Sequence, residues 1–227
     1  MSVSFEIREL SIVILAKNHN PTILNPDFLK YNNIVGNDWD LQESPICVEP
    51  LAQVFFKNKV KIISQRDKIV FSENITDKEI EGVLIPDISY KYTKTLPHVE
   101  YTAIGINPKG HLVIQGGQDE CQKFITEKFI RSGPWQNFGD SPVKTNIKFT
   151  YTLENLTCNV DIGETFFKSS DEKLIPVIGF GANLHRQLVG NDRNERLMDL
   201  HKIIKKWKKD LDLYKDLIKN ILGGENE

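Results

Sequence analysis

The alternation of apolar and polar residues in the first third of the chain predicts strands. Val3, Phe5 and Ile7 share one face, and a denser apolar run to Ala16 follows, which is typical of a strand buried on both faces of a sheet. An irregular stretch rich in Asn and Pro, Lys17–Pro45, comes next. Short polar turns then separate three expected strands of an antiparallel meander: Ile46–Lys57, Val60–Ser64 and Ile69–Glu73.

The middle of the chain predicts two helices and two hairpins. Thr76 and Glu79 have the spacing of a capping box, so a short helix is expected after the meander. His98–Asn107 and His111–Gln115 are expected to pair around a turn that contains Pro108. The other expected elements are a helix over Asp119–Ser132 and a hairpin that joins residues 143–153 to residues 156–162.

The C-terminal segment has the most regular pattern in the chain. Neither Pro nor Gly occurs from Arg193 to Leu222, Asp192 is suited to be the N-cap, and Gly223 supplies a stop. This predicts one long amphipathic helix, about 45 Å in length at about 1.5 Å per residue. Its apolar seam packs either on the protein's own sheet or, as a coiled coil, on a second copy or another protein. The seam consists of Leu197, Leu200, Ile204, Trp207, Leu211, Tyr214, Ile218 and Ile221.

A recurring pattern suggests that two halves of the chain are related. Trp39 and Trp135 each precede a Ser-Pro dipeptide and then a strand-rich region. Two interpretations remain open, a duplication or two unrelated loops. In either case the expected fold is α+β, with a mixed, largely antiparallel sheet built from two strand–crossover–strands halves and followed by the long helix. The expected divisions are residues 1–97, 98–190 and 191–227, and a crevice between the halves, with Trp39 and Trp135, is the expected ligand site.

Composition narrows the function classes. The 227 residues include 29 basic and 31 acidic side chains, a net charge of −2, so no chain-wide positive field exists to hold nucleic acid. No apolar run approaches the roughly 20 residues that span a bilayer, and residues 1–10 lack the apolar core of a secretion signal. Cys47, Cys121 and Cys158 are widely spaced and predict thiols rather than disulfides or a zinc site. We therefore expect a cytoplasmic protein without a membrane partner.

Few residues suggest chemistry. His185, Arg186 and Asp192 lie close in sequence before the long helix and are the best candidates for a hydrolase or nuclease site. The segment from Gly179 to Leu184 begins like a dinucleotide-binding loop, but it lacks the last glycine and the strand–helix–strand context, so no Rossmann site is expected. No other motif predicts a cofactor or a metal.

The sequence thus predicts a non-enzymatic, cytoplasmic protein-binding protein, an adaptor or assembly factor. It would bind another protein or a second copy of itself through the apolar seam and the crevice between the halves. Two alternatives remain: the hydrolase or nuclease described above, and a nucleic-acid binder that uses a lysine-rich face of the C-terminal helix, with Lys202, Lys205, Lys206 and Lys209.

Overall fold

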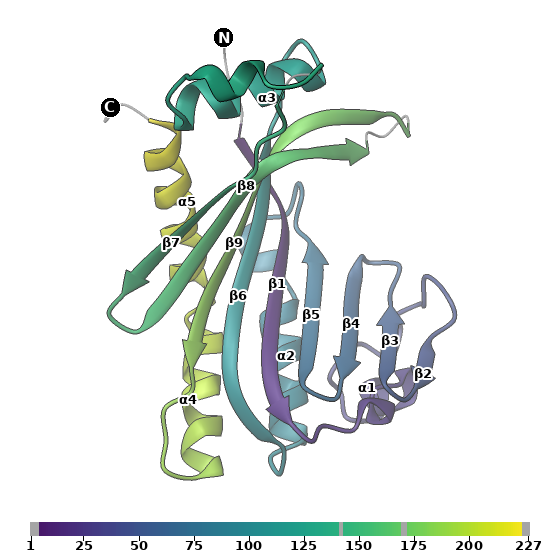
Figure 1. Ribbon diagram of the computed structural model, residues 1–227. Helices are drawn as coiled ribbons and strands as arrows, with labels where there is room; N and C mark the ends of the chain where they lie inside the picture. Colours follow the sequence, from purple (N-terminus) through teal and green to yellow (C-terminus); the bar gives the residue numbers. More distant parts are fainter. Residues whose placement is uncertain (1–4, 141–142, 169–171, 224–227) are drawn as a thin grey trace.

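The fold is α+β, built on an open, antiparallel sheet of nine strands (Figure 1). The computed structural model describes residues 5–140, 143–168 and 172–223. In sheet order, the strands are β2 (Ile46–Val48), β3 (Leu51–Phe55), β4 (Val60–Gln65), β5 (Lys68–Asn74), β1 (Phe5–Lys17), β6 (Glu100–Leu112), β9 (Leu174–Gln187), β8 (Leu156–Lys168) and β7 (Ile147–Leu153). The helices are α1 (Pro26–Tyr31), α2 (Ile85–Thr95), α3 (Gln118–Phe129), α4 (Arg193–Lys205) and α5 (Trp207–Leu222).

The strand order places two consecutive parts of the chain on either side of a central pair, β1 and β6. The part up to α2, here called the first half, forms β1 and the strands on one side of it. The part from β6 onward, the second half, forms β6 and the strands on the other side. β1 and β6 run antiparallel along almost their whole length, with Ile12 opposite Ile106.

The helices lie on one face of this sheet. α2 contacts β1 and β5, α3 contacts β8 and β9, α4 contacts β6, and α5 contacts β6 and β9. In β1, the side chains of Leu10, Ile12 and Ile14 face these helices and are fully buried. The alternate residues Val13 and Leu15 face the other side and are only partly buried. Within the described residues no helix covers that other side, which faces the viewer in Figure 1 and is called the helix-free face below.

The expected hairpin around Pro108 is wrong, because β6 is one continuous strand through this position. Proline lacks the amide that a central strand normally donates, so it is tolerated where the ladder is irregular. The neighbouring strand supplies that irregularity: the register of β1 shifts between Ile7 and Glu9, which leaves Arg8 as an extra residue next to this part of β6. The bulge therefore allows a sequence typical of a turn to run straight.

The single long C-terminal helix is also wrong, since it divides at Lys206 into α4 and α5. The amide of Lys206 bonds to the carbonyl of Ile203, and that of Lys209 bonds to Lys206, so the helix tightens to three-residue spacing here. The break lets both segments remain against the curved sheet, because a straight helix of that length would leave it.

The helix after the meander begins later than the capping-box pattern predicts. α2 starts at Ile85, and its first amides are capped by Glu73 of β5, which is buried. The Glu73 carboxylate accepts hydrogen bonds from the backbone amides of Leu84 at 2.7 Å and Ile85 at 3.1 Å, and it is paired with Lys78 at 2.6 Å. A buried carboxylate from a distant strand thus replaces the local cap, and it fixes α2 to the sheet.

Candidate functional site

The three candidate catalytic residues do not converge. His185 pairs with Gly105 and belongs to the helix-free face, while Arg186 points to the opposite face and forms a bidentate ion pair with Asp210 of α5, at 2.6 and 2.8 Å. Asp192 is the N-cap of α4 and accepts a hydrogen bond from the Glu195 amide at 2.9 Å. Each residue therefore has a place in the fold, and the three do not form one site.

The apolar seam of the C-terminal helices is already covered by the protein itself. Six of its eight side chains are buried, and only Leu197 and Ile221 remain half-buried. The Tyr214 hydroxyl donates a 2.7 Å hydrogen bond to the carbonyl of Phe180 in β9, and the Phe5 ring of β1 lies 6.0 Å from the Tyr214 ring. Of the two interpretations of the seam, packing on the protein's own sheet is the one that the contacts match.

Trp39 and Trp135 lie too far apart to share a crevice. Trp39 packs edge-on against Phe56, at 5.2 Å between ring centroids, beside the end of β3. Trp135 lies in a 3-10 turn, Pro134–Asn137, that precedes β7. Since β3 and β7 are near opposite edges of the sheet, the two indoles belong to separate regions.

A crevice between the halves does exist, but other residues line it. It has a volume of about 470 Å³, within the range of ligand pockets. Arg8, Glu9 and Asn74 from the first half form one side, and Lys109 and His111 of β6 continue it. The other side is the hairpin of β8 and β9, which extends past the end of β6 toward β5 (Figure 1). We call this cavity the inter-half crevice.

Two glycines lie in the floor of the inter-half crevice, and at one of them, Gly181, the backbone is bare. Gly179 and Gly181 face the helix-free side, whereas Phe180 and Ala182 between and beyond them point into the core. A Cβ atom added at Gly181 would meet only the Cγ of Lys109, at 3.9 Å. A ligand could therefore approach the backbone closely at Gly181, which is a common reason for glycine within a strand.

An aromatic ring from the hairpin closes one end of the inter-half crevice. The guanidinium of Arg8 lies 3.9 Å from the centroid of the Phe167 ring, and the His111 ring stacks on Phe167 at 5.2 Å with an interplanar angle of 19°. Glu6 is 3.0 Å from Arg8 and 3.9 Å from His111. These contacts hold the hairpin over the helix-free face and bring the basic groups of both halves together.

Two polar atoms beneath Phe167 lack hydrogen-bond partners. The Nε of Arg8 and the Nε2 of His111 are both buried and unpaired within the described residues. Burial lowers the pKa of His111, and the charge of Arg8 lowers this pKa further, whereas Glu6 raises it. Leaving a buried polar atom unpaired costs about 1–3 kcal/mol, so a ligand that supplied an acceptor to the Arg8 Nε–H, or a matching partner to the His111 ring, would relieve that cost.

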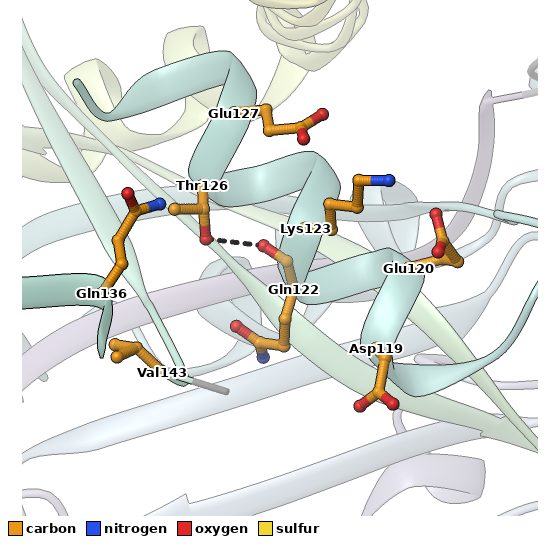
Figure 2. Close-up of a pocket in the computed structure, with 8 residues that line it drawn as sticks. All are labelled: Asp119, Glu120, Gln122, Lys123, Thr126, Glu127, Gln136 and Val143. Carbon is orange, nitrogen blue, oxygen red and sulfur yellow. Dashed lines mark hydrogen bonds between the residues drawn. The ribbon is translucent and has the colours of Figure 1, made fainter. Parts of the chain in front are cut away.

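A second cavity, under α3, lacks such unpaired groups (Figure 2). It has a volume of about 310 Å³, and the side chain of Gln122 projects beside it. Gln122 is fully engaged: its amide nitrogen donates to Glu164 at 2.6 Å, and its amide oxygen accepts from the backbone of Thr145 at 2.9 Å. This network fastens α3 to the sheet, so the cavity is explained by packing.

The comparisons with known proteins identify no relative: no protein-family model matches the sequence, and no curated protein matches it. Across the described ranges, no group of three or more His, Cys, Asp or Glu side chains is placed to hold a metal ion. None of the helices in the same ranges has the length and apolar character needed to span a membrane.

Sequence reasoning missed Arg8, Lys109, His111 and Phe167 as site residues. One signal was present, the alternation of glycines at 179 and 181 within an apolar strand, which indicates a close approach to the backbone. No local pattern could reveal the rest. The crevice arises because the β8–β9 hairpin contacts residues more than fifty positions away in sequence.

Proposed function

We propose that the protein is a non-enzymatic binding protein that holds a segment of a partner protein in the inter-half crevice. The observation that carries this proposal is the pair of buried, unpartnered polar atoms of Arg8 and His111, beside a floor of bare backbone at Gly181. A cavity with a few convergent polar groups on a largely preformed surface is the usual form of a binding site.

The chemistry of the walls favours a protein segment over nucleic acid. Phe167 and Arg8 both line the crevice, and aromatic residues and arginine are the side chains most enriched at protein interfaces. The basic groups are locally neutralised, Lys109 by Glu9 at 2.9 Å and Arg8 by Glu6 at 3.0 Å. A phosphate backbone would find no net positive track here, whereas the carbonyl or carboxylate oxygen of a peptide would find single donors.

The same geometry supports binding rather than catalysis. The candidate catalytic residues His185, Arg186 and Asp192 do not line the inter-half crevice. A general base must lie within hydrogen-bond reach of the proton that it removes. The hydrolase and nuclease alternative is less favoured for a further reason, because Arg186 is engaged by Asp210 on the opposite face.

The position of the crevice fits a duplicated origin of residues 1–97 and 98–190, which we include in the proposal. The strand order is nearly symmetric about the β1–β6 pair, with β5 next to β1 and β9 next to β6. The two tryptophans support an equivalence of the halves in a further way. A Cβ at Gly36 would meet the Trp39 indole at 2.7 Å, and one at Gly133 would meet the Trp135 indole at 2.9 Å, so each indole packs on a glycine close before it.

Site-specific photocrosslinking in the native host tests the proposal. A photoreactive phenylalanine analogue at Thr165, an exposed residue that lines the crevice next to Gly179, should capture a partner protein, whereas the analogue at Phe138, which is 88 % exposed and away from the crevice, should not. Substitution Gly181→Leu places a side chain on the floor and should abolish the crosslink. The matched control, Thr152→Leu, adds a similar side chain at an exposed position of β7 and should leave the crosslink intact.

The outcomes separate clearly. The proposal is wrong if position 165 yields no protein adduct, or if the adduct survives Gly181→Leu. Equal adducts at positions 165 and 138 would also contradict it, because they would report collisions with exposed surface rather than a site. Unfolding curves of both leucine variants accompany the assay, so that a loss of fold is not mistaken for a blocked floor.

A further inference from the structure

The two edges of the sheet differ in how well they are protected from pairing with another strand. The edge strand β2 has only three residues, and Pro45 and Pro50 flank it closely. The edge strand β7 has seven residues, contains no proline, and pairs with β8 without a register shift. Natural sheets usually blunt their edges with short strands, prolines, bulges or lysines. β7 has one such feature, Lys148.

The lysine is itself partly neutralised. The Lys148 ammonium lies 3.7 Å from the Asp161 carboxylate of β8, directly across the ladder. An edge lysine discourages pairing because an approaching strand would have to bury or repel its charge. A lysine that lies across its own sheet toward a carboxylate gives weaker protection, so the β7 edge remains open to another strand.

The turn at the end of β7 fixes which backbone groups are free. Leu153 and Leu156 are the last pair of the β7–β8 ladder and are separated by two residues, so they exchange both hydrogen bonds. Bonded pairs alternate along an antiparallel ladder. The amides and carbonyls of Lys148, Thr150 and Thr152 therefore point away from β8, and no described residue bonds to them.

From this edge we infer that the protein forms a homodimer in which β7 pairs antiparallel with β7 of a second copy, centred on Thr150. This register joins the two sheets into one and forms about six main-chain hydrogen bonds, two for each outward-facing residue. Like charges do not meet, because Lys148 lies opposite Thr152 of the partner subunit. On the helix-bearing face, Phe149 lies opposite Tyr151 of the partner subunit, an aromatic cross-strand pair of the kind that stabilises sheets.

The self-complementary register is the reason to choose a second copy as the occupant. With a twofold axis through Thr150, the outward amides and carbonyls of all three residues, Lys148, Thr150 and Thr152, form hydrogen bonds on both strands. Phe149 and Tyr151 are partly exposed in the single chain, so the pairing would also cover aromatic surface. The inference is independent of the proposed function, since the inter-half crevice lies near β1 and β6, several strands away from this edge.

Disulfide trapping tests the register. Paired residues that exchange backbone hydrogen bonds have Cα atoms about 5.5 Å apart, a separation that a disulfide accepts. In a Cys47→Ser background, which removes the exposed native thiol, Thr150→Cys should form a covalent dimer under mild oxidation. The matched control Thr152→Cys faces Lys148 of the partner subunit and should crosslink at least about tenfold more slowly. Equal rates, or no dimer from Thr150→Cys, would overturn the inference.

A measurement without crosslinking tests the hydrogen bonds. Thr150→Pro removes one outward amide at an edge position where proline is tolerated, whereas Thr150→Val keeps that amide. Sedimentation velocity should show the wild type and Thr150→Val as dimers and Thr150→Pro as a folded monomer. A wild type that remains monomeric at several hundred micromolar, or a Thr150→Pro variant that still dimerises, would refute the proposed pairing. If β7 instead binds a strand of a different protein, the purified wild type would remain monomeric, which is the first of these two refuting results.

Discussion

The ion pair between Arg186 and Asp210 provides the sharpest test of how the C-terminal helices are held. Its two hydrogen bonds measure 2.8 and 2.6 Å, and the side chains are only 17 % and 7 % exposed. Substitution Asp210→Ala leaves the Arg186 charge under α5 without a partner. Breaking a buried pair in this way costs about 3–5 kcal/mol, a large part of the total stability of an ordinary domain, about 5–15 kcal/mol. For a chain of this size the melting temperature should fall by roughly 6–20 °C.

Urea unfolding of the wild type and the variant measures this loss, provided that the slope of the transition is unchanged. The matched control is Asp40→Ala, which breaks an exposed pair with Lys57 at 3.1 Å and should cost less than about 1 kcal/mol. The double variant Arg186→Met/Asp210→Leu removes both charges and should recover most of the stability. The reasoning is refuted if Asp210→Ala costs less than about 1 kcal/mol, or if the double variant is as unstable as the single one.

Three further predictions follow from buried groups. Glu73→Ala removes the cap of α2 and should lower the free energy of unfolding by about 2 kcal/mol or more in urea titrations; a loss within error would contradict the capping role. Burial, and then the charge of His98, lowers the pKa of His19 from 6.5 to about 4. As the pH falls, His19 is protonated in the unfolded chain before it is protonated in the folded one. The free energy of unfolding should therefore decline by roughly 3 kcal/mol from pH 6.5 to pH 4, and His19→Asn should remove this part of its pH dependence. In the native protein a thiol reagent should modify Cys47 alone, because Cys121 and Cys158 are buried and burial raises the pKa of both; fast reaction of all three thiols would contradict the core packing.

Local patterns were sufficient where neighbouring residues determine the structure. Strict alternation located the β7–β8 hairpin, and helical periodicity located α3 within a few residues. The errors occurred where a distant element decides. Pro108 runs through a straight strand because β1 provides a bulge at Arg8, and the C-terminal helix breaks at Lys206, where both segments continue along the sheet. The cap of α2 likewise comes from Glu73, eleven residues before Leu84.

The same limit applies to the candidate site. The sequence predicts a crevice between two halves, but it assigns Trp39 and Trp135 to it because tryptophans are conspicuous. The lining residues are instead ordinary ones, such as Lys109 and Thr165, that meet only because the β8–β9 hairpin overhangs β1 and β6. No residue type marks such an overhang, since it depends on the register of β9 against β6: Ile178 lies opposite Leu112, the last residue of β6, so residues 174–177 and their partners in β8 extend beyond it.

The burial of the apolar seam changes where binding should be sought. A helix face that contributes Trp207, Leu211 and Tyr214 to the core cannot also recruit a partner without unfolding, because each large side chain contributes about 1.5–3 kcal/mol through its burial. Among the described residues, α2 to α5 pack on one side of the sheet and Phe28 of α1 packs on Tyr92 of α2, so the surface left for recognition is the helix-free face and the sheet edges. The side of an antiparallel sheet that no helix covers is usually solvated. On the helix-free face, the inter-half crevice brings together the Phe167 ring, the bare backbone at Gly181 and two unpaired polar atoms, and these are the observations behind the binding proposed above.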